Sequence, residues 1–555
     1  MRFKKIICAF LAIVFAMPAL VVSVEAKEVE EEVSREGDYS YVELNGEAVL
    51  VGYAGHAKEL ILPEELGGMP LSGIRRNVFL ENNTLLKIQL PAAMEDISPE
   101  QFCLCDNLQE VTVAEGNKVY TSVDGVLYQD GGKTLRLHPA AHSESYDIPE
   151  GVTKIAPYAF FTNKTLAAVT FPSTLKEIGD NAFYDCQILR EVYIPDSVVR
   201  VGESAFSWCI NLKELRVPDK LSDMGRSAFF PCYYVTHSEN EFVTLGDDVL
   251  VAYLGESTNI KIPEGVKTVS NVFFINEELE SISIPSTVET ISDYAFYGCK
   301  RLKSVELHKG IKKIGDWAFF GCEKLKSVIV PTGAEIGEYS FAGCVKLETA
   351  AVNTRKIPPY AFARCDRLEN FTFGPQVKEI GDYAFYFCEQ LKKIDVQGKF
   401  EVIGAHAFRR IGLEKMTLGT SVKKIGRSAF LENEQLVLKV TRGSYAHKYA
   451  TDNKLQMTVK EPSQKELNQI QEQEKADATF VELLFGEYLI WTIIGGAAFL
   501  LIIAALIIII IVCKRRKRRR LTQVEAAKAD EGEKSAETEA SVASSEETSF
   551  DVIEE

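Results

Sequence analysis

A motif of about 23 residues recurs through most of this 555-residue chain. The segments "IGDNAFYDCQILREVYIP" at 178–195 and "VGESAFSWCINLKELRVP" at 201–218 keep the same kinds of residue in the same order. A unit of this length cannot bury its own apolar face, so neighbouring units have to stack, and the repeat predicts a solenoid. One phenylalanine marks each copy: Phe79, Phe102, Phe160, Phe183, Phe206, Phe229, Phe273, Phe296, Phe319, Phe341, Phe362, Phe385, Phe408 and Phe430.

Each unit follows the pattern IPxxVxxIGxxAFxxCxxLxxVxI. Its last residues alternate between apolar and polar, which predicts a short, half-buried strand. In one copy, Val192 and Ile194 are expected to point inward, and Glu191 and Tyr193 outward. The glycine after Ile is expected to supply a turn, and the phenylalanine to fill the interior. The predicted fold is a solenoid of short strands in one long curved sheet, with loops or short helical turns on the opposite side.

Three segments interrupt or end the regular array, at 49–66, 125–152 and 249–266. They share apolar runs that lead into a Pro-Glu or similar step, and we interpret them as β-hairpin units that start or restart the stack. At the other end, Ser444 is expected to cap a short helix, followed by a strand at 455–459. An open solenoid needs such end caps because its terminal core would otherwise face water.

Both ends of the chain carry signals for export and membrane anchoring. Residues 1–26 begin basic, continue apolar and end in Val-Glu-Ala, which is typical of a cleaved signal peptide, with an uncleaved anchor as the alternative. Residues 488–513 contain no charge and are long enough for a C-terminal transmembrane helix. Seven cations follow at once, which predicts that this end is cytoplasmic.

These signals predict a single-pass protein of the plasma membrane. Its extracellular domain is expected at 27–460, and a stalk at 461–487. Residues 514–555 are expected to form a basic stop-transfer segment and then an acidic cytoplasmic tail, whose composition is poor in aromatic residues and typical of disorder.

Several of these motifs resemble one known family. Units such as "ISDYAFYGCKRLKSVEL" at 291–307, the "IPEGV" that follows two of the hairpins, and the ending "GSYAHKYA" at 443–450 are similar to the BspA-like leucine-rich-repeat family of microbial surface proteins. The resemblance covers roughly residues 39–459. It implies a curved leucine-rich-repeat domain, displayed outside the cell and used for adhesion or ligand binding, with no catalytic residues. The membrane helix and acidic tail are not general to that family.

Nine cysteines occupy the third position after the repeat phenylalanine. One Cys per unit at a fixed position favours a stacked ladder of buried structural thiols over disulfide pairs, although adjacent thiols that lie close enough could still oxidise. Other units have Asn163, Asn276 or Asn433 at this position. The predicted ladder consists of Cys105, Cys186, Cys209, Cys232, Cys299, Cys322, Cys344, Cys365 and Cys388.

A column of aromatic residues is the strongest candidate for a binding surface. The second residue before the repeat phenylalanine is aromatic in five consecutive units and His406 in the sixth. Two interpretations stay open: these rings cover the edge of the core, where earlier units have Asn181, Ser204 or Ser227, or they contact a protein or glycan ligand. The candidate ligand-binding residues are Tyr294, Trp317, Tyr339, Tyr360 and Tyr383. The outward strand positions form a second candidate surface with mixed charges.

Other classes of function lack a sequence signal. We find no nucleophile-elbow, P-loop or paired-Cys motif, and only His138 and His142 are closely spaced, so we expect no enzyme activity, metal, cofactor or small-molecule substrate. The net charge of −17 argues against nucleic acid. The expected partners are an extracellular protein or glycan, and the lipid bilayer through 488–513. The expected function is adhesion to host or neighbouring cells, or, alternatively, a receptor that relays ligand binding to its tail.

Overall fold

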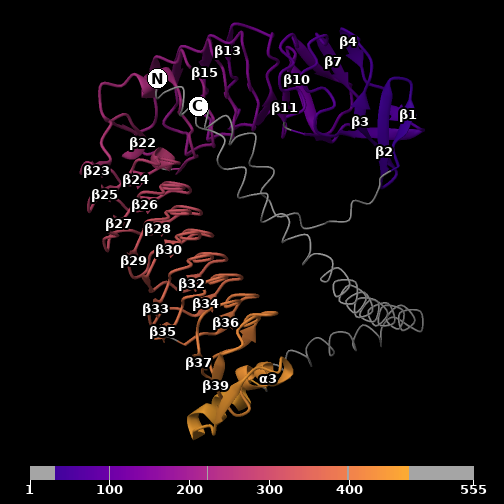
Figure 1. The fold of residues 1–555 in the computed structure, drawn as a ribbon. Coiled ribbons are helices and arrows are strands. Elements are labelled where there is room, and N and C mark those ends of the chain that lie inside the picture. The colour runs from indigo at the N-terminus through magenta and orange to yellow at the C-terminus, as the bar shows by residue number, and fades with distance from the viewer. Residues whose placement is uncertain (1–31, 99, 222, 397–398, 474, 476–555) are drawn as a thin grey trace, which may run out of the picture. The chain divides into compact units, whose positions relative to one another are not determined.

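The computed structural model describes residues 32–473 and 475, apart from 99, 222 and 397–398. The chain divides into two compact units, Met1–Glu461 and Pro462–Glu555, and the described strands all belong to the first. Figure 1 shows these strands as successive short elements along the repeat array. The array is a solenoid, as the repeat predicts.

The strand predicted at the end of each unit is present. Strands β13 (Ser145–Asp147), β15 (Ala168–Thr170), β17 (Glu191–Tyr193) and β19 (Glu214–Arg216) pair in parallel, with Ala168 opposite Glu191 and Glu191 opposite Glu214. Val192 is fully buried, whereas its neighbours in the strand are exposed. The alternation in the sequence therefore predicts correctly which side chains enter the core.

Outside the predicted sheet, each unit has the expected turns and also a second strand ladder that the sequence did not predict. The two residues that end in the consensus Ile form β14 (Lys154–Ile155), β16 (Glu177–Ile178), β18 (Arg200–Val201) and β20 (Asp223–Met224), again in parallel register. A strand of two residues is too short to carry a period-2 pattern, and its pairing depends on the backbone of the next unit. Each unit thus contributes to two sheets.

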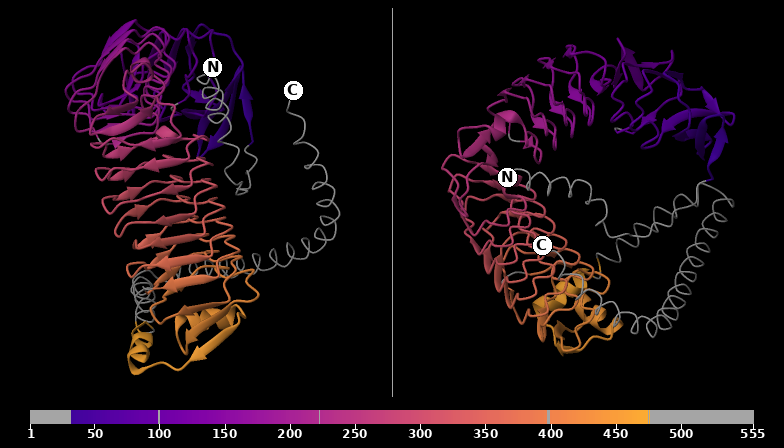
Figure 2. Two further views of the ribbon diagram at one scale, coloured as in Figure 1. Left: turned by 60° about the vertical axis from the view of Figure 1, so that its left-hand side comes forward. Right: turned by 45° about the horizontal axis from the view of Figure 1, so that its top comes forward.

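Strands at equivalent positions recur beyond residue 255 in several separate sheets, and Figure 2 shows them stacked side by side. Those equivalent to the first ladder are β23 (Asn259–Lys261), β25 (Ser281–Ser283), β27 (Ser304–Val305), β29 (Ser327–Ile329), β31 (Thr349–Val352), β33 (Asn370–Phe373), β35 (Lys393–Val396), β37 (Lys415–Leu418) and β39 (Val437–Thr441). Those equivalent to the second are β24 (Thr268–Val269), β26 (Thr290–Ile291), β28 (Lys313–Ile314), β30 (Glu335–Ile336), β32 (Lys356–Ile357), β34 (Glu379–Ile380), β36 (Val402–Ile403) and β38 (Lys424–Ile425).

Hairpins start or restart the stack; the first and third begin earlier than predicted, whereas the second begins within the predicted segment. The antiparallel pairs are β2 (Tyr39–Leu44) with β3 (Glu47–Tyr53), β11 (Val126–Gln129) with β12 (Thr134–Leu137), and β21 (Phe242–Leu245) with β22 (Val249–Tyr253). The last strand of each hairpin then pairs in parallel with the second ladder. Around them lie β1 (Ser34–Glu36), β4 (Glu59–Ile61), β5 (Glu65–Leu66), β6 (Met69–Ile74), β7 (Lys87–Leu90), β8 (Asp96–Ile97), β9 (Glu110–Val113) and β10 (Tyr120–Val123).

The C-terminal end of the array has the expected helix. Helix α3 (Tyr445–Asp452) begins after Ser444, whose hydroxyl oxygen accepts a 3.2 Å hydrogen bond from the His447 amide. Ala446 and Ala450 are buried against the last repeats. Strand β40 (Met457–Lys460) then pairs with β39 and extends the first ladder by one strand.

The repeat phenylalanines form the centre of the core. Phe183 and Phe206 are fully buried, and their ring centroids lie 4.9 Å apart with nearly parallel planes. Phe160 and Phe229 extend the same stack on either side. Each ring fills the space between two neighbours, which supports the prediction that a single unit depends on the next for its core.

The glycine of the repeat pattern has a different role from the predicted turn. Gly315 does not have positive φ, but a Cβ atom on it would lie 2.7 Å from the carbonyl carbon of Ser292 and nearer still to the Asp293 amide nitrogen. Gly202 and Gly404 meet the preceding unit in the same way. In these units glycine is therefore required because two backbones approach closely.

Several predicted segments lie outside the described residues. These are the signal peptide at 1–26, the membrane span at 488–513 and the tail at 514–555, together with residues 474 and 476–487 of the stalk at 461–487. Within the part of the chain that the structure describes, no helix combines the length and apolarity needed to span a membrane.

Candidate ligand-binding surface

The aromatic column occupies a backbone position with unusual geometry. Tyr294, Trp317 and Tyr360 have φ of 60°, 59° and 57°, in the left-handed region. Asn181 and Ser204 have φ of 56° and 53° at the same position, so the repeat imposes this conformation whatever the side chain. Bulky residues rarely adopt it, at a cost of about 1–2 kcal/mol each. The backbone supports the turn, since the Trp317 amide donates to the Glu338 carbonyl at 2.8 Å.

The structure brings all five candidate residues together in one continuous stack. The ring centroids of Trp317 and Tyr339 are 4.0 Å apart, and those of Tyr339 and Tyr360 are 4.4 Å apart. Tyr383 follows at 4.7 Å from Tyr360, and Tyr294 precedes Trp317 at 6.2 Å. Interplanar angles along the column are 9° or less, so the rings lie face to face.

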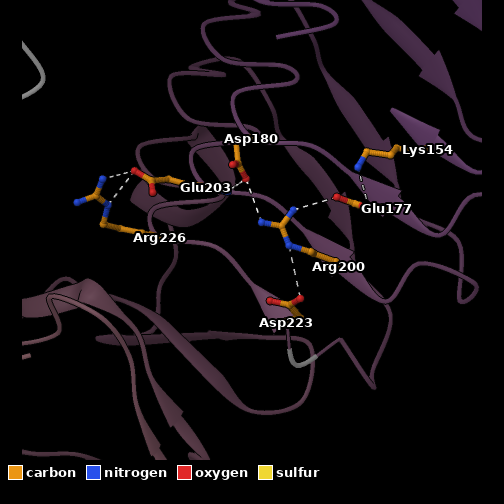
Figure 3. A network of polar contacts seen from close by, with 7 residues as sticks. All are labelled: Lys154, Glu177, Asp180, Arg200, Glu203, Asp223 and Arg226. Carbon is orange, nitrogen blue, oxygen red and sulfur yellow. Dashed lines mark hydrogen bonds and ion pairs between the residues drawn. The ribbon is translucent and has the colours of Figure 1, made fainter. Parts of the chain in front are cut away.

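Both ends of this aromatic column are covered. The Arg226 guanidinium lies over the Tyr294 ring at 4.6 Å and also binds the Glu203 carboxylate. Figure 3 shows this pair beside a second group of ion pairs centred on Arg200. At the other end, His406 stacks on Tyr383 at 4.6 Å. Ring faces are thus occupied throughout, and the half-exposed side chains present ring edges and hydroxyl groups to solvent.

A second aromatic column lies beside the first and was not among the predicted site residues. Phe274, Tyr297 and Phe320 each follow a repeat phenylalanine, and their rings are 5.2 and 5.1 Å apart. Phe320 contacts Trp317 at 4.8 Å, which joins the two columns. The aromatic residues at this fixed position in three consecutive units were a signal that could have revealed it.

Carboxylates accompany the aromatic column on its N-terminal side in the sequence. Asp293, Asp316, Glu338 and Asp382 each precede a column residue and are exposed. One oxygen of Asp316 accepts a 2.7 Å hydrogen bond from the Glu338 amide, and Asp293 does the same for the Asp316 amide at 2.9 Å. These bonds fix one carboxylate oxygen and leave the other accessible, so an acidic row runs along the column.

Three phenols of the column, Tyr294, Tyr339 and Tyr360, have raised pKa values and are neutral at physiological pH. Burial, together with the neighbouring phenols of Tyr339 and Tyr383, raises the pKa of Tyr360 to about 12. Burial also raises the pKa of Tyr339. Neutral phenols can donate a hydrogen bond as well as accept one.

All nine predicted ladder cysteines are buried and free of disulfides. The Cys186 thiol donates to the Phe160 carbonyl, in the preceding unit, at 3.1 Å, and eight of the nine make the equivalent contact. The Asn433 amide nitrogen donates to the Phe408 carbonyl at 2.7 Å from the same position. Both residue types thus supply a donor to one carbonyl, which explains how Asn can stand where other units have Cys. Burial raises the pKa of Cys344 to about 12, which disfavours the reactive thiolate.

The one closely spaced pair of histidines, His138 and His142, is packed among aromatic rings. His138 is buried, stacks on Phe160 at 4.7 Å, and contacts the His142 ring edge-on at 5.0 Å. Burial, assisted by His142, lowers the pKa of His138 to about 3. Among the described residues, no group of three or more potential ligands could hold a metal ion.

Two strand ladders per unit around a column of phenylalanines define the class as a leucine-rich-repeat solenoid. The sequence profile of the BspA type leucine rich repeat region matches residues 57–124, 140–248, 252–355 and 333–437, in 6 copies. The chain belongs to this family, as its motifs predict. None of the curated proteins matches the chain.

Several of the solved structures with similar folds are of bacterial proteins. A leucine-rich repeat protein from Bacteroides ovatus is 21% identical, covers 78% of this chain and 100% of its own, and has a TM-score of 0.36. A leucine rich cell surface protein from Faecalibacterium prausnitzii is 24% identical over 66% of this chain and 95% of its own, with a TM-score of 0.29. The pneumococcal vaccine antigen PcpA is 16% identical over 78% and 99%, with a TM-score of 0.30.

Proposed function

We propose that this protein is a cell-surface adhesin that binds a protein partner along the aromatic column and its acidic row. The observation that carries the proposal is the run of five stacked rings from Tyr294 to Tyr383, kept despite the left-handed backbone at each position. Asn or Ser fits this conformation in other units, so bulky aromatic residues at the position in five consecutive units favour a role for these side chains beyond the turn itself.

The geometry favours a protein ligand over a glycan at this surface. A sugar that stacks on an aromatic residue needs a free ring face, and the faces from Trp317 to Tyr383 are covered by neighbours at 4.0–4.7 Å. The exposed groups are ring edges, phenol hydroxyls and carboxylates, a combination that suits an extended polar segment with Lys or Arg side chains. The net charge of −17 would also steer a basic partner toward the domain.

Surface display rests on the leader at 1–26 and the apolar run at 488–513, with the repeats outside the cell. Adhesion is the function we favour, because the exterior domain presents a long binding surface. The alternative is a receptor that relays binding to residues 521–555. Removal of those residues separates the two: cell adhesion should persist, whereas a signal should be lost.

The test uses cells that display the full-length chain on a panel of immobilised matrix proteins and glycans. The triple variant Asp293→Asn, Asp316→Asn, Asp382→Asn keeps the amide hydrogen bonds but removes three charges. We expect adhesion to a basic protein to weaken roughly tenfold at low ionic strength, since each rim charge contributes up to about 1 kcal/mol.

The matched control is Asp180→Asn. Asp180 occupies the same position in a unit without the aromatic column, and its carboxylate accepts the same bond, from the Glu203 amide at 2.9 Å. This control should adhere normally. Equal adhesion by the triple variant and the wild type, or adhesion to glycans alone, would contradict the proposal.

A further inference from the structure

The repeats of Phe229 and Phe273 remain in contact although an insertion separates them in the sequence. The insertion adds a short helix and a hairpin that regular units lack. The Ser227 amide donates to the Asn271 side-chain oxygen at 3.1 Å, and the Asn271 amide nitrogen donates to the Ser227 hydroxyl at 2.9 Å. These bonds join units on either side of the insertion. The inserted residues form helix α2 (Tyr233–Thr236) and the β21–β22 hairpin.

A pocket of about 330 Å³ lies at this insertion. Its lining combines inserted residues with one side chain from the preceding repeat, Lys213. The volume is at the small end of the range for small-molecule sites, about 300–1,000 Å³, and suits a single sugar ring or a comparable group. The principal lining residues are Lys213, Tyr233, Tyr234, His237, Asn240 and Phe242.

The charge of the pocket is opposite to that of the protein as a whole. No carboxylate is among its lining residues, although the chain has a net charge of −17. Lys213 is exposed, and its ammonium nitrogen lies 5.5 Å from the centre of the Tyr233 ring. This cation is therefore available to an anionic group that enters the pocket.

The other polar groups of the pocket suit hydroxyls. His237 stacks on Tyr233 at 3.9 Å, and its Nδ1 lies 3.3 Å from the Tyr233 carbonyl oxygen. Nδ1 also lies 3.1 Å from the Thr236 hydroxyl, and with Nδ1 protonated toward these partners Nε2 is the ring acceptor that is left. The Asn240 amide and the hydroxyls of Ser238 and Thr244 add further donors and acceptors.

We propose that this pocket binds an acidic sugar, with the sugar carboxylate paired to Lys213. Its hydroxyls hydrogen-bond to His237 and Asn240, and the C–H face of its ring lies against Tyr234 or Phe242. Tyr234 is 38% exposed and Phe242 is half-buried, so both offer apolar surface at the rim. The site is separate from the aromatic column and does not depend on the function proposed for that column.

The experiment measures binding to the full-length protein in detergent by saturation-transfer NMR. The probes are glucuronic acid and N-acetylneuraminic acid, with glucose as a sugar without a carboxylate and acetate as a carboxylate without a sugar. We expect at least one acidic sugar to bind with a millimolar Kd, at least tenfold more tightly than glucose or acetate. If both acidic sugars bind with a Kd of roughly 50 mM or weaker, the proposal is overturned. Binding of glucose as tight as that of the acidic sugars also overturns it.

Matched lysine variants test the role of the ammonium group. Lys213→Gln should weaken acidic-sugar binding about five- to tenfold, which is the effect of one charge-assisted contact. Lys326 is exposed at the same position of another repeat, seven residues after Phe319, and Lys326→Gln should change nothing. Equal effects of the two variants overturn the proposal. Asp316→Asn, which probes the aromatic column, should leave sugar binding intact, so failure of either function is distinguishable from failure of the other.

Discussion

Replacement of Gly315 by alanine tests whether close backbone approach holds adjacent repeats together. The added Cβ would lie 2.7 Å from the carbonyl carbon of Ser292, within a unit whose backbone is itself fixed by pairing. The Asp293 carboxylate, which would lie nearest, can rotate away, but the backbone atoms of Ser292 and Asp293 cannot. The two units must move apart, which stretches the 2.8 Å hydrogen bond from the Gly315 amide to the Ile291 carbonyl.

The cost follows from three contributions. Overpacking against backbone costs about 2 kcal/mol, and weakening of the hydrogen bond costs about 1 kcal/mol. Alanine restricts the unfolded chain more than glycine does, which offsets about 0.5 kcal/mol. The net loss is about 2.5 kcal/mol, and because each 1.4 kcal/mol is a factor of ten, local opening becomes about 60-fold more frequent.

Hydrogen–deuterium exchange of the full-length protein, followed by mass spectrometry, measures this opening. Amides of residues 291–319 should exchange about 60-fold faster in Gly315→Ala. Pro358→Ala is the control, since Pro358 occupies the corresponding position and already carries a Cβ atom. Its unit should keep normal protection. If both variants exchange at wild-type rates within a factor of three, the close-approach argument is wrong.

Three further predictions concern single side chains. Cys322→Ala should destabilise the protein by about 2 kcal/mol in urea unfolding, whereas Cys322→Ser, which keeps a donor to the Phe296 carbonyl, should cost less. Burial lowers the pKa of His138 to about 3, so between about pH 6.5 and pH 3 this side chain is protonated in the unfolded chain but not in the folded protein. The free energy of unfolding should therefore fall by about 1.4 kcal/mol for each pH unit of acidification in this range, and His138→Phe should remove this dependence. Arg200→Gln, which removes the three ion pairs of Arg200 drawn in Figure 3, should lower stability by about 1 kcal/mol at low salt and by nothing measurable in 1 M NaCl.

Local patterns in the chain were sufficient to predict the repeat, the strand at the end of each unit and the buried phenylalanines. They also located the five aromatic residues and the nine cysteines, because one residue type at one position of every unit has to align when units stack. The repeat motifs alone were enough to indicate the family. Whether the aromatic column binds a partner remains a prediction that the binding assays address.

The sequence alone did not predict the specific contacts that each unit makes with its neighbours. The second strand ladder consists of two-residue strands such as Glu177–Ile178, whose pairing is a property of the neighbouring backbone and not of their own side chains. The same holds for Gly315, which is required by the approach of the preceding unit, and for Cys186, whose thiol has its acceptor in Phe160. A repeating chain specifies what each unit contains, whereas only the stacked structure decides which faces are covered and where an insertion opens a pocket.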